Sequence, residues 1–186
     1  MKAETLIELL RLDPPSNHRI TKLEVLLDRG PSTPAEIAEE AGCRPPNVLS
    51  VFYRLARYGI VSSEPTPSLS PRGRPTSIWT AADANGTKDE QLVMLMNRCP
   101  QTQRTMQQIE LLFYRPMTAF EIAPELGISK QMTHLRCQRM FKAGILGTKI
   151  DNAITYYVNH KDAVKPVITN PRISQRANKI ALGAWV

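Results

Sequence analysis

A run of hydrogen-bonding and basic side chains at helical spacing is the part of the chain best suited to chemistry. Lys130 and Gln131 follow Ser129, which can cap a helix by accepting a hydrogen bond from its first turn. The glutamine amide matches the donor and acceptor pair on the major-groove edge of adenine. Arg136 and Arg139 are better placed for phosphates, which supply affinity without sequence information. The run predicts a base-reading helix with contact residues Ser129, Lys130, Gln131, His134, Arg136, Gln138 and Arg139.

An earlier segment predicts a second helix of the same kind with a more neutral surface. Pro45-Pro46 falls in its first turn, where proline is tolerated, but the two rings narrow what this helix can present to a base. Val48, Phe52 and Leu55 share one stripe, so we expect them to be packed and Val51 to lie elsewhere. The contact residues expected here, in a weaker base-reading role, are Arg44, Asn47, Ser50 and Arg54. The same spacing in the later helix predicts packing at Thr133, Cys137 and Met140.

A third candidate contact is the segment Pro71-Arg72-Gly73-Arg74-Pro75, which has the core sequence of an AT-hook. Two arginines flank a glycine in this motif, so that extended backbone can sink into a narrow minor groove. Narrow grooves concentrate negative potential in A·T-rich tracts and attract inserted arginine. We expect Arg72, Gly73 and Arg74 to contact the minor groove or the adjacent phosphates. A hairpin tip whose arginines are merely solvated is the alternative interpretation.

These segments belong to a repeat, because residues 33–61 and 118–146 align at a constant offset of 85. Thr33–Gly42 lies over Thr118–Gly127 without a gap, and both copies contain Glu-Ile-Ala, a turn glycine and a closing Gly-Ile pair. An ungapped match of this length indicates a duplicated structural unit. Within each copy, the two helices around the turn glycine are typical of a helix-turn-helix.

Each copy predicts three helices followed by a β-hairpin, because helical spacing of apolar residues gives way to short strands after the closing glycine. The fold class expected is mainly α, with small β-hairpin wings and two tandem domains. Helix 2–12 lies outside the repeat, so it must cover the first domain or pair with its copy in a dimer. The strands expected are 60–64, 76–80, 145–150 and 154–158. The parts expected are an N-terminal helix (1–16), a first domain with the arginine-rich wing (17–82), a connecting helix (83–102), a second domain (103–160) and a basic C-terminal tail (161–186).

The charge of the chain favours a polyanionic partner. The formal net charge is +7 and the isoelectric point is about 9.5. Residues 1–86 carry 10 basic and 10 acidic side chains, whereas residues 87–186 carry 14 and 7. The whole surplus therefore lies in the second half of the chain.

The remaining chemistry-bearing residues argue against a metal site, a cofactor and an enzyme. Cys43, Cys99 and Cys137 are far apart and lack a histidine at ligand spacing, so we expect reduced, packed thiols. Acidic residues are not clustered as a metal-dependent nuclease would need, and Tyr156-Tyr157 has the alternating neighbours of a packed strand. There is no signal-peptide or membrane-spanning run. We expect a cytoplasmic, nucleoid-associated protein with no membrane partner.

Both copies resemble the winged helix-turn-helix domains of bacterial transcription regulators. The resemblance rests on residues 36–61 and 121–146, and on Arg72–Thr80, which is similar to the wing of such families. It covers most of residues 17–160 and implies that the third helix of each domain enters the major groove. Pro45-Pro46 and Thr133 depart from the usual pattern, because a recognition helix seldom starts on two prolines and its buried register is usually aliphatic.

Three functions follow as expectations. The leading one is a sequence-specific binder of double-stranded DNA, most simply a transcriptional regulator of a bacterium or mobile element, with two linked reading heads. A replication initiator or partition factor of plasmid or phage type is an alternative; the chain lacks the Gly-Lys-Ser/Thr loop of an ATP site. A protein-docking adaptor is the third, favoured by the net-neutral first half. A homodimer through the N-terminal helix or the C-terminal tail is a further expectation.

Overall fold

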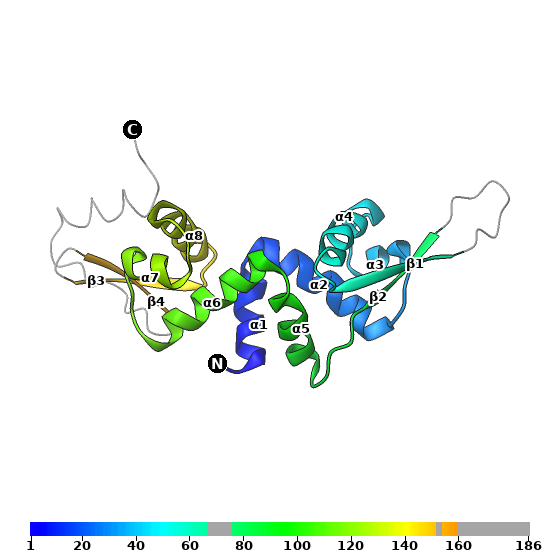
Figure 1. The fold of residues 1–186 in the computed structure, drawn as a ribbon, viewed down its shortest axis with the longest axis horizontal. Coiled ribbons are helices and arrows are strands. Elements are labelled where there is room, and N and C mark those ends of the chain that lie inside the picture. Colours follow the sequence, from blue (N-terminus) through cyan, green and yellow to red (C-terminus); the bar gives the residue numbers. More distant parts are fainter. Residues whose placement is uncertain (67–75, 152–153, 160–186) are drawn as a thin grey trace. The chain divides into compact units, whose positions relative to one another are not determined.

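The computed structural model describes residues 1–66, 76–151 and 154–159. The chain is mainly helical with two small antiparallel hairpins, as expected, and it divides into two compact units between Gln107 and Gln108, inside helix α6 (Figure 1). The first unit contains α1 (Ala3–Leu12), α2 (Pro14–Arg29), α3 (Pro34–Glu40), α4 (Pro45–Ala56), β1 (Val61–Thr66), β2 (Thr76–Ala81), α5 (Lys88–Asn97) and the start of α6 (Pro100–Tyr114). The second contains the rest of α6, α7 (Ala119–Glu125), α8 (Lys130–Lys142), β3 (Leu146–Asp151) and β4 (Ile154–Asn159).

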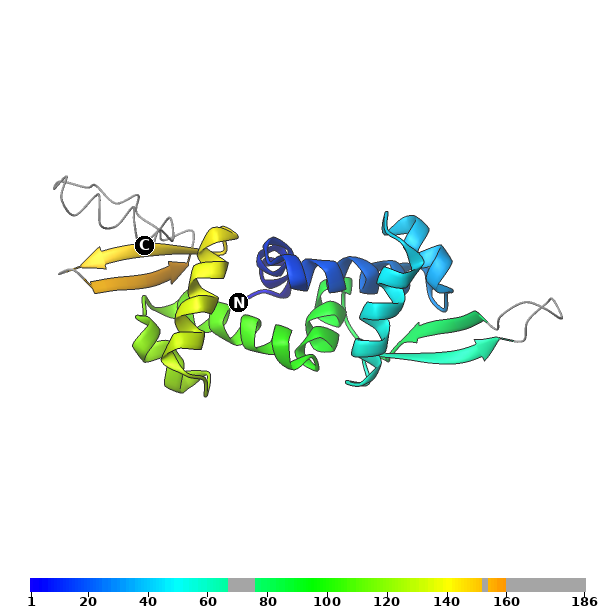
Figure 2. The same cartoon turned by 90° about the horizontal axis from the view of Figure 1, so that it is seen from above.

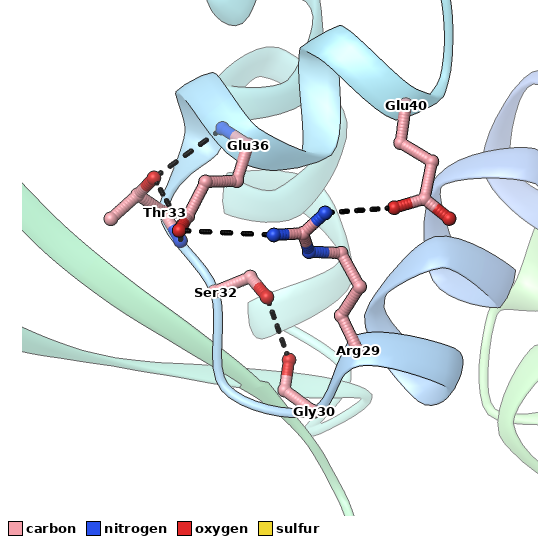
Figure 3. A network of polar contacts seen from close by, with 6 residues as sticks. All are labelled: Arg29, Gly30, Ser32, Thr33, Glu36 and Glu40. Carbon is pink, nitrogen blue, oxygen red and sulfur yellow. Dashed lines mark hydrogen bonds and ion pairs between the residues drawn. The ribbon is translucent and has the colours of Figure 1, made fainter.

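The short helices begin where the sequence supplies capping boxes. The Thr33 hydroxyl accepts a hydrogen bond from the Glu36 backbone N–H, while the Glu36 carboxylate accepts one from the Thr33 backbone N–H. Thr118 and Glu121 repeat this arrangement at α7. Figure 3 shows Arg29 reaching from the end of α2 to Glu36 and Glu40, with N–O distances of 3.9 and 3.1 Å. These contacts fix the start of α3 beside the end of α2.

A glycine turn joins α3 to α4 in the first unit and α7 to α8 in the second. Gly42 and Gly127 both have a φ of 60°, a left-handed conformation that costs little only without a Cβ. In the first unit, the N–H that follows the glycine donates to the carbonyl of Ala38 at 2.9 Å. The equivalent bond to Ala123 measures 3.1 Å. The two turns are therefore the same structure at an offset of 85.

The core of the first unit corrects one prediction about α4. Val48, Phe52 and Leu55 are buried as expected, but Val51 is buried too, with only 1% of its surface exposed. It lies three residues after Val48 and four before Leu55, so it widens the apolar stripe instead of facing solvent. Trp79 of β2 covers this stripe, and its ring centroid lies 5.3 Å from that of Phe52.

Each hairpin forms a further β-bridge with one residue of the loop that precedes α3 or α7. Ser32 pairs with Trp79 through two backbone hydrogen bonds of 3.0 and 2.8 Å. Met117 pairs with Tyr157 in the same way, at 3.1 and 2.8 Å. These pairs hold each hairpin against the helices of its own unit.

The repeat is longer than the sequence comparison indicated. At the offset of 85, the bounds of α1 coincide with those of α5, those of α3 with α7, and those of β1 with β3. The offset falls to 78 at the last strand, because nine residues separate β1 from β2 and only two separate β3 from β4. The N-terminal helix, which the sequence pattern placed outside the repeat, therefore has the connecting helix as its equivalent in the second copy.

These two helices meet inside the first unit, where α1 packs against α5 and α2 (Figure 1 and Figure 2). Ile7 and Leu10 of α1 are buried, and so are their equivalents Leu92 and Leu95. The N-terminal helix therefore covers its own unit, one of the two roles expected for it. None of the described helices has both the length and the apolar character needed to cross a bilayer.

Candidate nucleic-acid interface

Helix α8 presents most of its predicted contact residues to solvent. The Ser129 hydroxyl caps the helix by accepting a hydrogen bond from the Met132 N–H at 3.2 Å. The predicted packed residues Thr133, Cys137 and Met140 are all buried, which fixes the rotation of the helix. The contact residues that this rotation leaves exposed are Ser129, Lys130, Gln131, His134 and Arg139.

Arg136 and Gln138 are half-buried, so they differ from the exposed positions we expected. The Arg136 Nε donates to Gln108 Oε1 at 3.2 Å, and the Gln108 amide donates to Cys137 Sγ at 2.9 Å. This chain of contacts ties α8 to the second part of α6. Burial raises the pKa of the Cys137 thiol to about 12, so the sulfur stays protonated and serves as a packed acceptor.

His134 is held from two sides. The Gln138 Nε2 lies 2.9 Å from Nε2 of the imidazole, and the Tyr157 hydroxyl lies 3.4 Å from Nδ1. An amide nitrogen can only donate, so His134 Nε2 accepts and Nδ1–H points to the phenol oxygen. Burial raises the pKa of Tyr157 to about 12, which keeps that phenol neutral. The hairpin therefore sets the orientation of a predicted contact residue on the helix.

Three large apolar side chains lie exposed on α7 and α8, and none of them was among the predicted contact residues. Phe120 is 66% exposed, Met132 51% and Leu135 53%. The ammonium of Lys130 lies 4.5 Å from the centre of the Phe120 ring, a cation–π contact that connects the two helices. The exposure of Met132 and Leu135 could have been predicted, because neither residue belongs to the buried stripe of Thr133, Cys137 and Met140.

Helix α4 carries a polar version of the same surface. Arg44, Asn47, Ser50 and Arg54 are all exposed, as predicted. Asn47, Ser50 and Arg54 follow at spacings of three and four, so they share one side of the helix. The Arg54 Nε donates to the carbonyl of Ser50 at 3.1 Å, which holds the guanidinium along the helix.

A cluster of basic side chains beside α4 was not predicted. Lys22 is buried, and its ammonium lies 3.0 Å from Nδ1 of His18 and donates to the His18 carbonyl at 3.1 Å. Burial lowers the pKa of Lys22. Burial also lowers the pKa of His18, with further contributions from Lys22, Arg54 and Arg19. Over the described ranges, no ion pair joins His18, Lys22 or Arg54 to a carboxylate. The cluster therefore creates a positive potential that an approaching anion would relieve.

Arg72, Gly73 and Arg74 lie outside the described residues, and so does the predicted basic tail. The strands β1 and β2 lead to and from the segment that contains the three wing residues. Within the part of the chain that the structure describes, no group of three His, Cys, Asp or Glu side chains could hold a metal ion. Comparison of the chain with known protein families, with curated proteins and with solved structures finds no match.

Proposed function

We propose that the protein is a sequence-specific binder of double-stranded DNA, built from two winged helix-turn-helix domains and acting most simply as a transcriptional regulator. One observation carries the proposal. At equivalent positions of an internal repeat, α4 and α8 each bury one stripe and expose hydrogen-bonding and basic side chains outside it, which are Asn47, Ser50 and Arg54 on α4 and Gln131, His134 and Arg139 on α8. An α-helix with side chains is about 10–12 Å across, and the major groove is about 12 Å wide.

The elements around these helices support the winged-helix interpretation. In each copy a supporting helix, a short capped helix, a glycine turn and the exposed helix precede an antiparallel hairpin. With α8 in the major groove, Lys130 and Gln131 would reach base edges and Arg139 a phosphate. The wing arginines Arg72 and Arg74 would follow the adjacent minor groove.

Selection from random duplexes, followed by mobility shifts at rising salt, tests the proposal. We expect one recurring sequence and an affinity that falls steeply with salt, because each neutralised phosphate releases counterions. Gln131→Ala should relax the preference at one base position by about 1–3 kcal/mol. Lys2→Gln, which removes an exposed charge from the start of α1, is the matched control and should leave the preference unchanged. Selection of no sequence would overturn the proposal.

A protein-docking role is the second candidate, and the exposed apolar side chains of α7 and α8 favour it. Such a protein would show no salt-sensitive duplex binding. The two candidates therefore separate in the same mobility-shift experiment.

A further inference from the structure

The two exposed helices differ at two equivalent positions. Met132 and Leu135 on α8 are 51% and 53% exposed. At the offset of 85, α4 has Asn47 and Ser50 there, which are exposed and polar. At these two positions the same scaffold thus presents hydrogen-bonding groups on α4 and large apolar groups on α8.

The fold of α8 does not require these apolar side chains. Its packing against the second unit uses Thr133, Cys137 and Met140, which lie on the opposite stripe. Met132 and Leu135 are three residues apart, so they lie next to each other on the helix surface. An adjacent apolar pair that the core does not use is available for contact with a partner.

The neighbours of the pair identify what covers it. Gln131, His134 and Arg139 are exposed between and around Met132 and Leu135, so donors and a positive charge interrupt the apolar surface. The major groove places the apolar 5-methyl group of thymine beside hydrogen-bond acceptors. The mixed face of α8 matches that edge.

We propose that Met132 and Leu135 recognise thymine 5-methyl groups, so that α8 reads a thymine-containing half-site, while α4 presents the polar side chains of Asn47 and Ser50 at the same two positions. The inference rests on the proposed function and adds base chemistry to it. It also predicts that the bound sequence has two chemically different halves, although the two domains arose from one repeat.

Replacing thymine by deoxyuridine in the selected duplex, one position at a time, tests the inference. Deoxyuridine lacks only the methyl group and keeps the pairing and the acceptor oxygen. We expect about a fourfold loss of affinity at each contacted position, which corresponds to about 0.8 kcal/mol for one buried methyl-sized group. The sensitive positions should cluster in one half of the site.

The variant M132N/L135S gives α8 the side chains that α4 carries at the equivalent positions. It should bind the thymine and deoxyuridine duplexes equally, while N47A/S50A, the matched control, keeps the full deoxyuridine penalty. Both substituted positions of α8 are half exposed and lie off the buried stripe, so the variant should keep the fold with a slightly lower thermal midpoint than the wild type. If the variant fails to fold, the wild-type scan still decides.

Equal wild-type affinity for thymine and deoxyuridine at every position would overturn this inference and leave duplex recognition intact. A penalty that survives in M132N/L135S would overturn it as well, because other residues would then contact the methyl groups. Failure of the wild type to select any duplex would overturn the proposed function and this inference together.

Discussion

The burial of Lys22 lowers the stability of the first unit. Lys22 is 2% exposed, and its ammonium contacts the neutral His18 imidazole and donates to the His18 carbonyl. A buried charge without a carboxylate partner destabilises the folded state. Lys22→Met should therefore raise the free energy of unfolding by about 1 kcal/mol, measured by urea denaturation at neutral pH.

The same variant should raise the pKa of His18, because Lys22 is the second-largest cause that lowers it, after burial. An NMR titration of the imidazole would follow the change towards the ordinary value of 6.5. Lys2→Met, at an exposed position, is the control and should change neither quantity. A less stable Lys22→Met protein would show that the ammonium has a favourable role in the folded state.

Tyr157 is expected to position His134 through its hydroxyl, which lies 3.4 Å from Nδ1. Tyr157→Phe keeps the buried ring and removes that contact, so the fold should be retained with a loss of about 0.5–1.5 kcal/mol. We expect a severalfold weaker affinity for the selected duplex, measured by mobility shift, because the imidazole loses its fixed orientation. The adjacent Tyr156→Phe is the control. Equal affinities for the wild type and Tyr157→Phe would show that the contact between the Tyr157 hydroxyl and His134 does not contribute to duplex binding.

Residue-level prediction from the sequence succeeded where spacing alone decides burial. Thr133 and Cys137 are buried as their spacing predicted. The prediction for Val51 was wrong because the buried face of α4 is wider than the stripe formed by Val48, Phe52 and Leu55. The contact between Arg136 and Gln108 could not be predicted, because it joins residues 28 positions apart through side-chain geometry.

At the scale of the element, three capping boxes make stability depend on pH. Hydrogen bonds from Thr33, Thr87 and Thr118 lower the pKa of Glu36, Glu90 and Glu121 below the ordinary 4.5. A carboxylate with a lowered pKa binds fewer protons in the folded state. Its contribution is therefore full above pH 4.5 and is lost as the pH falls through the folded pKa. Thermal unfolding measured between pH 6 and pH 3 should show a midpoint temperature that decreases once the pH is below about 4.5.

Thr33→Ala should lower the stability of the first unit by about 1 kcal/mol at neutral pH and weaken this pH dependence, because it removes a cap and the hydroxyl donor to Glu36. Ser63→Ala, on an exposed position of β1, is the control. An unchanged pH profile for Thr33→Ala would show that another group controls acid unfolding.

The element scale also explains why half of the repeat escaped notice. Helices α1 and α5 occupy equivalent places, yet their sequences share an apolar pattern and almost no identities. A packed helix tolerates any apolar residue of suitable size, whereas a glycine turn and a capping box require particular residues. Sequence comparison therefore detects the turn and the capping box and misses the packed helix.

At the scale of the whole molecule, the repeat predicts two DNA contacts in one chain. Arg54 and Arg139 are equivalent at the offset of 85, and we expect each to contact one phosphate. On a full-length site, each substitution by alanine should reduce the slope of log affinity against log salt concentration by about one, and the double variant should reduce it by about two.

Half-sites separate the two domains in the same measurement. On a duplex that carries only the sequence read by α8, Arg139→Ala should still lower affinity while Arg54→Ala should have no effect. The full site should bind more tightly than either half, because the linked domain acts at a high effective concentration. If Arg54→Ala instead weakens binding equally on the half-site and the full site, both arginines serve one contact surface, and the duplication provides a single reading head.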